Sequence, residues 1–184
     1  MEVFWERGYE GTSVSDLTAA MGINSPSLYA AFGGKEDLFR EAVALYDRLE
    51  GSATERALRD EPTARQAIAA MLCDNAEIYA DPDKPSGCLI VLGVTTWTAR
   101  NETVRKYLAE LRALTQEAIR ARLERGVADG DVEPTANLDA LASYFNTVLE
   151  GLSIQARDGA SRETMLAIAD CAMASWDALA RPRN

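Results

Sequence analysis

Apolar positions recur with a helical period along almost the whole chain, and the polar–apolar alternation of strands is missing. One helix is expected to open at Ser13, because Asp16 three residues later completes the pattern of a capping box. The stretch Gly22–Asn24 is typical of a tight turn. Ser25 followed by Pro26 then indicates a second helix start. The pattern predicts an all-α protein with a helix-turn-helix near its N-terminus.

The segment before this motif is short. Val3 to Trp5 resemble the end of a helix that Gly8 and Gly11 can terminate, since glycine reaches left-handed backbone angles without strain. We therefore expect further residues upstream of Met1 in the natural protein.

The chain after the motif predicts longer helices. A helix over residues 35–49 should turn Leu38, Ala42, Leu45 and Leu49 inward. Further helices are expected over residues 63–79 and 101–125 and in two segments after residue 137. The stretch CLIVLGVTTWT, residues 88–98, is apolar on every side and should be enclosed by the other helices.

The last two predicted helices carry apolar positions at heptad-like spacing, with second apolar lines beside them. We interpret these lines as the contact surface of a two-fold homodimer built on a four-helix bundle. The alternative is ordinary two-sided burial within one chain. The expected dimer contacts are Leu141, Phe145, Val148, Leu152, Met165, Ala169, Ala172, Met173 and Trp176.

The amino-acid composition excludes several classes of function. The chain has no histidine, which removes Ser-His-Asp and Cys-His triads and the histidine-based zinc motifs. Cys73, Cys88 and Cys171 are far apart and fit neither a disulfide framework nor a metal site. No apolar run is long enough to span a membrane, and the start lacks the layout of a signal peptide. We expect a cytoplasmic protein without a cofactor or a metal ion, and no catalytic residues.

The distribution of acidic residues singles out one segment. The chain has a net charge of -10, yet the longest run without Asp or Glu, Leu17–Lys35, covers the second helix of the motif. A helix that enters the major groove of DNA needs thin side chains at its N-terminal end and no carboxylates near the phosphates. The segment has both properties, and Lys35 behind it could pair with a phosphate. The pattern therefore favours duplex DNA as a partner.

The segment GYEGTSVSDLTAAMGINSPSLYAAFGGKEDLFREAV resembles the DNA-binding domain of TetR-family transcriptional regulators over about Phe4–Val43. The resemblance implies an N-terminal three-helix helix-turn-helix domain, which we place at residues 1–48. A C-terminal helical domain for ligand binding and dimerisation should occupy residues 52–184. It also implies that Thr12, Ser13, Tyr29 and Lys35 hold phosphates, and that the bases face Ser25, Pro26, Ser27, Ala30 and Ala31.

Two features depart from the family pattern. Many relatives carry larger side chains at the positions of Ala30 and Ala31, so base readout here should rest on few hydrogen bonds and partly on thymine methyl groups or DNA shape. Residues 1–50 also hold nine acidic and only four basic side chains. A basic arm upstream of Met1 would supply the missing attraction to phosphates.

Resemblance to the family further implies a repressor that a small molecule releases from a palindromic operator. Aromatic and neutral polar residues on otherwise apolar helices suggest an apolar or aromatic ligand. The candidate ligand-binding residues are Met71, Asn75, Cys88, Leu92, Thr96, Trp97, Tyr107, Leu111, Phe145 and Asn146. For each of them alone, core packing is the competing interpretation.

Two other classes of protein fit the sequence less well. An enzyme would need a convergent set of titratable side chains, which the apolar stretch from Cys88 to Trp97 does not offer. A helical homodimeric adaptor that binds protein partners without DNA would also be acidic. It would have no use for the acid-free segment.

Overall fold

The structure is a computed structural model that describes residues 1–95 and 99–180. Within these ranges the secondary structure is helical and contains no strand, as the periodicity predicts. The N-terminal helices are α1 (Glu2–Arg7), α2 (Val14–Met21), α3 (Ser25–Phe32) and α4 (Lys35–Tyr46). The others are α5 (Ser52–Asp60), α6 (Ala64–Tyr79), α7 (Leu89–Leu92), α8 (Glu102–Asp129), α9 (Leu138–Arg157), α10 (Arg162–Ala174) and α11 (Trp176–Leu179).

Local sequence signals set both helices of the motif. Ser13 and Asp16 form the predicted capping box at the start of α2. Gly22 ends this helix in the left-handed conformation, with φ 65°, which favours glycine. The next helix does begin at Ser25, but its cap is Asn24, whose side chain accepts a hydrogen bond from the Ser27 amide. The helix-turn-helix is therefore encoded locally.

Replacing Ser13 by alanine should lower the free energy of unfolding by about 1 kcal/mol, because the Asp16 amide loses its acceptor and the Asp16 carboxylate loses a donor. Urea denaturation followed by circular dichroism would measure the difference. The Ser15→Ala variant is the matched control, since Ser15 is exposed on the same helix and does not cap it. Equal losses in both variants would contradict the capping role.

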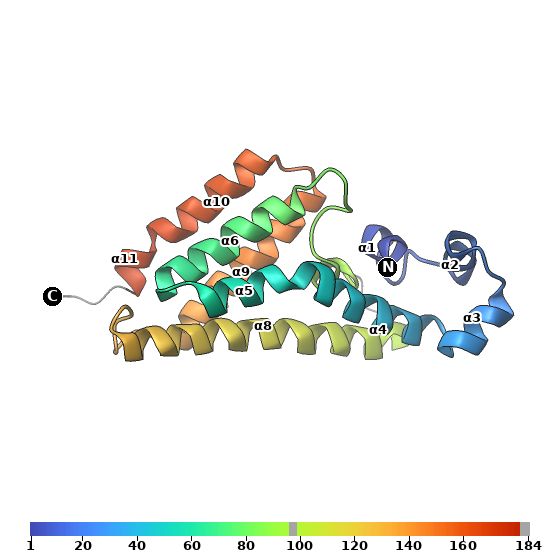
Figure 1. Cartoon of the computed structure of the whole chain (residues 1–184), viewed down its shortest axis with the longest axis horizontal. Coiled ribbons are helices and arrows are strands. Elements are labelled where there is room, and N and C mark those ends of the chain that lie inside the picture. Colours follow the sequence, from blue (N-terminus) through green and yellow to red (C-terminus); the bar gives the residue numbers. More distant parts are fainter. Residues whose placement is uncertain (96–98, 181–184) are drawn as a thin grey trace.

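The helix after the motif does not end at the expected domain boundary. A π-helical turn, Asp47–Gly51, joins α4 to α5, so the chain stays helical from the motif into the body (Figure 1). The predicted inward face is wrong in part, because Leu45 and Leu49 are 37% and 59% exposed. The buried face is shifted in register and carries Phe39, Ala42, Val43 and Tyr46.

Aromatic packing explains this shift. The Phe39 ring meets the Phe4 ring edge to face at 5.0 Å, and Tyr46 meets Trp5 at 4.8 Å. The rings bury more apolar surface against α1 than leucines on the neighbouring face could, and edge-to-face pairs add to this. The heptad spacing of the leucines alone could not show which face α1 would cover.

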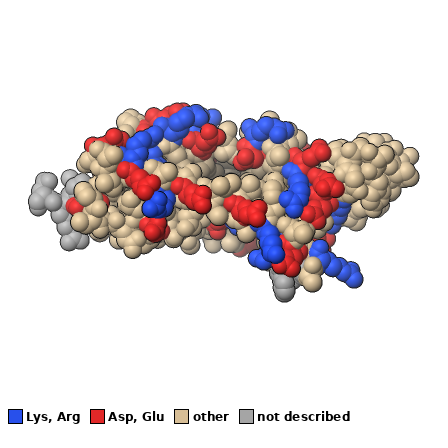
Figure 2. Space-filling model, turned by 90° about the horizontal axis from the view of Figure 1, so that it is seen from below, with Lys and Arg blue, Asp and Glu red and all other residues tan. Residues whose placement is uncertain are grey.

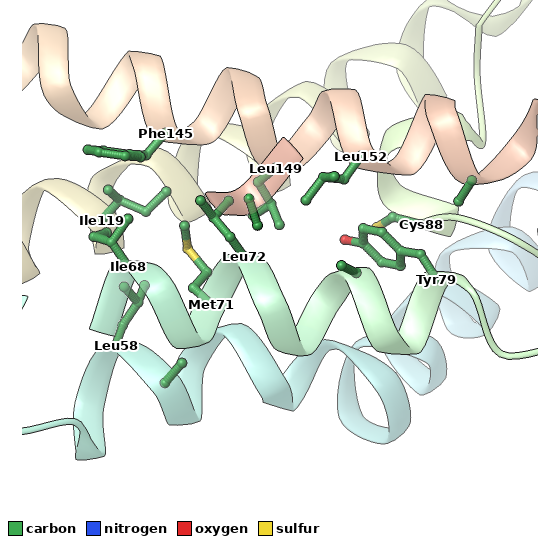
Figure 3. Packing of buried hydrophobic residues seen from close by; sticks show 14 of the residues in the cluster. Leu58, Ile68, Met71, Leu72, Tyr79, Cys88, Ile119, Phe145, Leu149 and Leu152 are labelled. Atoms are coloured by element: carbon green, nitrogen blue, oxygen red, sulfur yellow. The ribbon is translucent and has the colours of Figure 1, made fainter. Parts of the chain in front are cut away.

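The body is a helical bundle in which α6 packs against α5, α9 and α10, while α8 packs against α9 (Figure 1). Figure 3 shows the core between α6 and α9, where Phe145, Leu149 and Leu152 face Met71, Leu72 and Ile68. The predicted helix over 63–79 is confirmed, and Thr63 is its cap. No helix among the described residues is long and apolar enough to cross a membrane.

The structure corrects the predicted dimer contacts. Except for the half-buried Val148, all of them lie in the core of a single chain, including Phe145 at 0% and Trp176 at 1% exposure. The heptad-like spacing arises because α9 and α10 pack on each other and on α6. Exposed apolar side chains on the outer faces are instead Tyr144, Ile154 and Leu179.

Candidate nucleic-acid interface and ligand cavity

The second helix of the motif projects from one end of the molecule. Its side chains Ser25, Pro26, Ser27, Ala30 and Ala31 are all exposed. Figure 2 shows that the end formed by α2 and α3 carries neither acidic nor basic side chains on the face in view. Leu28 is fully buried and packs α3 against the rest of the motif. The exposed face is thin and free of carboxylates, as a surface that enters a DNA groove requires.

Two side chains that can bind phosphate, Tyr29 and Lys35, border this face. Tyr29 is 52% exposed. Lys35 is half-buried, and its Nζ lies 4.1 Å from the centre of the Tyr9 ring. Tyr9 itself packs edge to face on Phe39 at 5.2 Å. Burial lowers the pKa of Lys35 from its usual value. Tyr9 was not among the predicted residues, and its ring holds the ammonium in place through a cation–π contact.

The side chains of the two residues before α2 are less available to bind phosphates than the resemblance implies. Thr12 is 1% exposed, and its hydroxyl donates to the Gly8 carbonyl at 2.7 Å. Its side chain therefore ties the loop to α1 and is not available to a phosphate, which corrects the prediction. Ser13 is exposed, but its hydroxyl already bonds to the Asp16 carboxylate. The hydrogen bonds that the Ser13 hydroxyl and backbone amide donate to the Asp16 carboxylate lower the pKa of Asp16.

A small cavity of about 70 Å³, partly open to solvent, lies where α4, the π-helical turn after it, α5, α6, α7, α8 and α9 meet. Three predicted residues line it, namely Asn75, Cys88 and Asn146. Other lining residues were missed: Tyr46, Asp47, Glu50, Gly51, Thr54, Tyr79, Ile90, Val91, Arg112, Thr115, Leu149 and Glu150. The lining is thus more polar than the predicted set.

The thiol of Cys88 lies between two phenols in this cavity. Tyr46 from α4 and Tyr79 from α6 line the cavity together with it. Burial raises the pKa of both tyrosines, so they remain protonated donors. The Cys88 amide donates to the Ser153 hydroxyl at 2.7 Å. Residues from four separate segments therefore converge at one point.

The remaining predicted ligand residues are not part of this cavity. Met71 and Phe145 are fully buried in the core. Leu111 lines a neighbouring groove beside α5, and Leu92 lines another pocket near Arg7. The Tyr107 ring packs against the Arg40 guanidinium at 4.5 Å. Thr96 and Trp97 lie outside the described residues.

Helix α7 connects the cavity to the motif. Cys88, directly before it, and Ile90 and Val91 within it line the cavity. Two hydrogen bonds join the same segment to α1 and to the turn after it: Trp5 Nε1 donates to the Gly87 carbonyl, and the Tyr9 amide donates to the Gly93 carbonyl, both at 2.7 Å. Movement of α7 would therefore shift α1 through these hydrogen bonds.

One arginine reinforces this junction between the N-terminal residues Trp5–Tyr9 and the segment Gly87–Gly93. Arg157, at the end of α9, donates to the carbonyls of Ser86, Trp5 and Glu6 at 3.1, 2.8 and 2.9 Å. A single guanidinium thus fixes the loop before α7 to the C-terminal end of α1, where cations are favoured by the helix dipole.

A helix-turn-helix with a bare recognition face, joined to a helical body with an internal cavity, defines a DNA-binding regulator. Comparison with known families agrees with this class. Residues 1–42 match the family described as "Bacterial regulatory proteins, tetR family", and residues 62–166 match "Tetracyclin repressor-like, C-terminal domain". The chain belongs to the TetR family of bacterial regulatory proteins. The family consists of transcriptional regulators, which confirms the expectation that the chain is not an enzyme.

Individual relatives span nearly the whole chain. The HTH-type transcriptional repressor ComR of Escherichia coli K12 is 31% identical over 98% of this chain and 87% of its own length. The repressor BdcR of the same organism is 29% identical over 91% and 80%. A cysteine variant of the TetR family transcriptional regulator CifR, complexed with 26-base-pair operator DNA, is 43% identical with a TM-score of 0.93. That similarity covers 95% of this chain and 92% of CifR.

Proposed function

We propose that this TetR-family regulator is a transcriptional repressor that binds a palindromic operator as a homodimer and leaves it when a small molecule enters the cavity. Residues 1–48 act as the DNA-binding unit, and residues 52–184 bind the ligand and the second subunit. The observation that carries the proposal is the exposed, uncharged face of α3 on a protein of net charge -10. The relatives named as repressors and the operator complex of CifR support it.

Base contact falls to the exposed side chains of α3, and phosphate contact to Tyr29 and Lys35. Small side chains allow the α3 backbone to approach the base edges closely, and the hydroxyls of Ser25 and Ser27 can donate or accept there. The Lys35 ammonium is fixed over Tyr9 before DNA arrives, so little side-chain entropy is lost on binding.

The homodimer would place two α3 helices in successive major grooves, about 34–36 Å apart. We assign the contact to the outer faces of α9 and α10, where small or apolar side chains are exposed, such as Tyr144, Ile154 and Ala167. Since the seams predicted from the sequence are filled within one chain, these outer faces are the surface that the two helices leave to a partner.

The contacts between α7 and the N-terminal residues explain how a ligand would release the DNA. A molecule that fills the space beside Cys88, Ile90 and Val91 must shift α7, whose flanking residues Gly87 and Gly93 are bonded to Trp5 and Tyr9. The motif would then tilt away from the spacing that DNA needs. Coupling of this kind is reciprocal, so DNA should weaken ligand binding by the same factor. The lining suits a small molecule with an aromatic or apolar part and several hydrogen-bonding groups.

Selection of bound fragments from a random duplex pool tests the proposed operator. We expect an enriched inverted repeat whose half-sites are one helical turn apart. A pool without enrichment, measured with a dimeric protein, would refute operator recognition and would favour the protein-interaction adaptor.

Replacing Lys35 by alanine should weaken binding to every duplex sequence alike and reduce the slope of log affinity against log salt by about 1, as expected for one lost phosphate contact. Fluorescence anisotropy over a salt series would measure both quantities. Lys106→Ala is the matched control, since Lys106 is exposed on α8 and paired with Glu102. An unchanged slope in the Lys35 variant would remove Lys35 from the interface.

A further inference from the structure

A long groove runs between α5 and α8, beside the cavity but with most of its lining of its own. It has a volume of about 880 Å³ and is open to solvent. Leu111, Leu114 and Ala118 follow one another along its α8 wall, and Leu58 and Ile90 face them. Leu114 is 59% exposed, although α8 is otherwise rich in charged residues on its outer surface. The wall is therefore an accessible apolar strip.

Arg122 lies at the end of this strip and is buried to an unusual degree for a charged side chain. It is 3% exposed and lines the groove. Its Nη2 donates to the Glu61 carbonyl at 3.2 Å, while Nε and Nη1 have no hydrogen-bond partner. A buried charge that is neither paired nor fully hydrogen-bonded is costly, so such groups are rare unless something else completes them.

The neighbours of Arg122 do not complete it. Arg125, one turn along α8, donates to the carbonyls of Leu58 and Arg59 and so caps the end of α5. Burial lowers the pKa of Arg122, and the positive charge of Arg125 lowers it further. Asp129 and Asp131 attract the guanidinium but are not hydrogen-bonded to its Nε or Nη1. Capping of α5 thus explains Arg125 and only one nitrogen of Arg122.

We propose that the groove is a binding site for a small amphipathic anion, whose carboxylate or phosphate head pairs with Arg122 and whose apolar chain lies along Leu114 and Leu111. Nε and Nη1 make no hydrogen bond, and turning the rigid guanidinium toward the groove would exchange only the Nη2 bond to the Glu61 carbonyl for bonds to the head group. Arginine is suited to this role, since its planar fork pairs with two oxygens of one head group.

The distance along α8 sets the size of the occupant. Leu111 and Arg122 are separated by three turns of helix, or roughly 16 Å at 1.5 Å per residue. A molecule with a single medium-length chain can reach from the arginine to the far leucine. Two independent features, the partnerless guanidinium and the exposed leucine, thus agree on one kind of ligand with an acid at one end and hydrocarbon at the other.

The site is tested by isothermal titration calorimetry of the intact chain with decanoate and decyl phosphate, each measured in the absence of DNA. Decanol and decyltrimethylammonium are the head-group controls. We expect both anions to bind and both controls to bind at least tenfold more weakly. Equal binding of decanol, or no binding of either anion, overturns the proposal.

Two substitutions locate the binding. Arg122→Met keeps an unbranched apolar stem but removes the charged guanidinium, and should weaken decanoate binding at least tenfold without lowering the melting temperature, since an incompletely paired charge is lost. Arg120→Met is the matched control on the exposed face of α8, where Arg120 pairs with Asp139 and Glu124. Equal loss in both variants, or a melting temperature that falls for Arg122→Met alone while decanoate still binds, shows a purely structural role and overturns the proposal.

A wall variant keeps the test decisive if Arg122→Met does not fold. Leu114→Asp changes an exposed side chain and should leave the fold intact, while the new carboxylate repels the anion and removes apolar contact. Decanoate binding should then fall at least tenfold. Unaltered binding by Leu114→Asp overturns the placement of the chain along α8. None of these readouts depends on operator binding, so the outcome is separate from that of the proposed repressor function.

Discussion

Aspartate in place of Ala30 is expected to lower operator affinity by about 100-fold or more while the protein stays folded. Ala30 is exposed on the face of α3 that we assign to the bases, in the middle of the acid-free run Leu17–Lys35. A carboxylate there would meet the negative potential of the groove, and like charges brought together at an interface cost several kcal/mol. Gel shift or anisotropy with the selected operator would measure the loss.

The matched control is Ala113→Asp, which places the same carboxylate at an exposed position of α8 far along the chain from the motif. Both changes replace alanine within a helix, so both should cost up to about 0.7 kcal/mol of helix propensity. Only the Ala30 variant should lose the operator. If the two variants bind alike, the acid-free face of α3 is not the surface that meets DNA.

Truncation of Trp5 to alanine is expected to destabilise the protein by about 3–5 kcal/mol, the range found for buried aromatic side chains. Trp5 is 2% exposed, meets Tyr46 edge to face at 4.8 Å and donates from Nε1 to the Gly87 carbonyl. Its loss removes the packing between α1 and α4 and the bond to the α7 segment together. Urea denaturation would measure the free energy of unfolding.

A second variant separates packing from hydrogen bonding. Trp5→Phe keeps an aromatic ring but leaves the Gly87 carbonyl without its donor, which should cost about 1–3 kcal/mol. Tyr29→Ala is the opposite control, because Tyr29 is 52% exposed. It should change stability by no more than about 0.5 kcal/mol while weakening operator binding. A Trp5→Ala variant as stable as Tyr29→Ala would show that the junction contributes little to the fold.

The candidate DNA interface was largely predictable from the sequence because its signals are local. The capping box at Ser13, the turn at Gly22 and the start at Ser25 depend on side chains within three or four residues of each other. Exposure of Ala30 follows once Leu28 is buried, since residues two apart point to different sides of a helix. The error at Thr12 is local as well, because its hydroxyl donates to the carbonyl of Gly8, four residues earlier, and is not left free for a phosphate.

The ligand cavity was only partly predictable because it is made by segments that are distant in the chain. Asn75, Cys88 and Asn146 were found as polar or small residues on apolar stretches. Tyr46 could have been found from the spacing Phe39, Val43, Tyr46, which marks the true buried face of α4. Arg112 and Glu150 gave no signal, since charged residues on helices are usually exposed.

The sequence by itself determined the helical class, the helix-turn-helix with its caps and turn, and the uncharged surface of α3, since each depends on periodicity or on neighbours along the chain. Only the tertiary structure decided which faces of the later helices are buried. The heptad-like lines of α9 and α10 fit an intramolecular or an intermolecular seam equally well, and the packing of α6 against both helices chose the first. Long-range packing likewise left Arg122 buried without a full set of partners, because burial depends on elements that come together only in the fold.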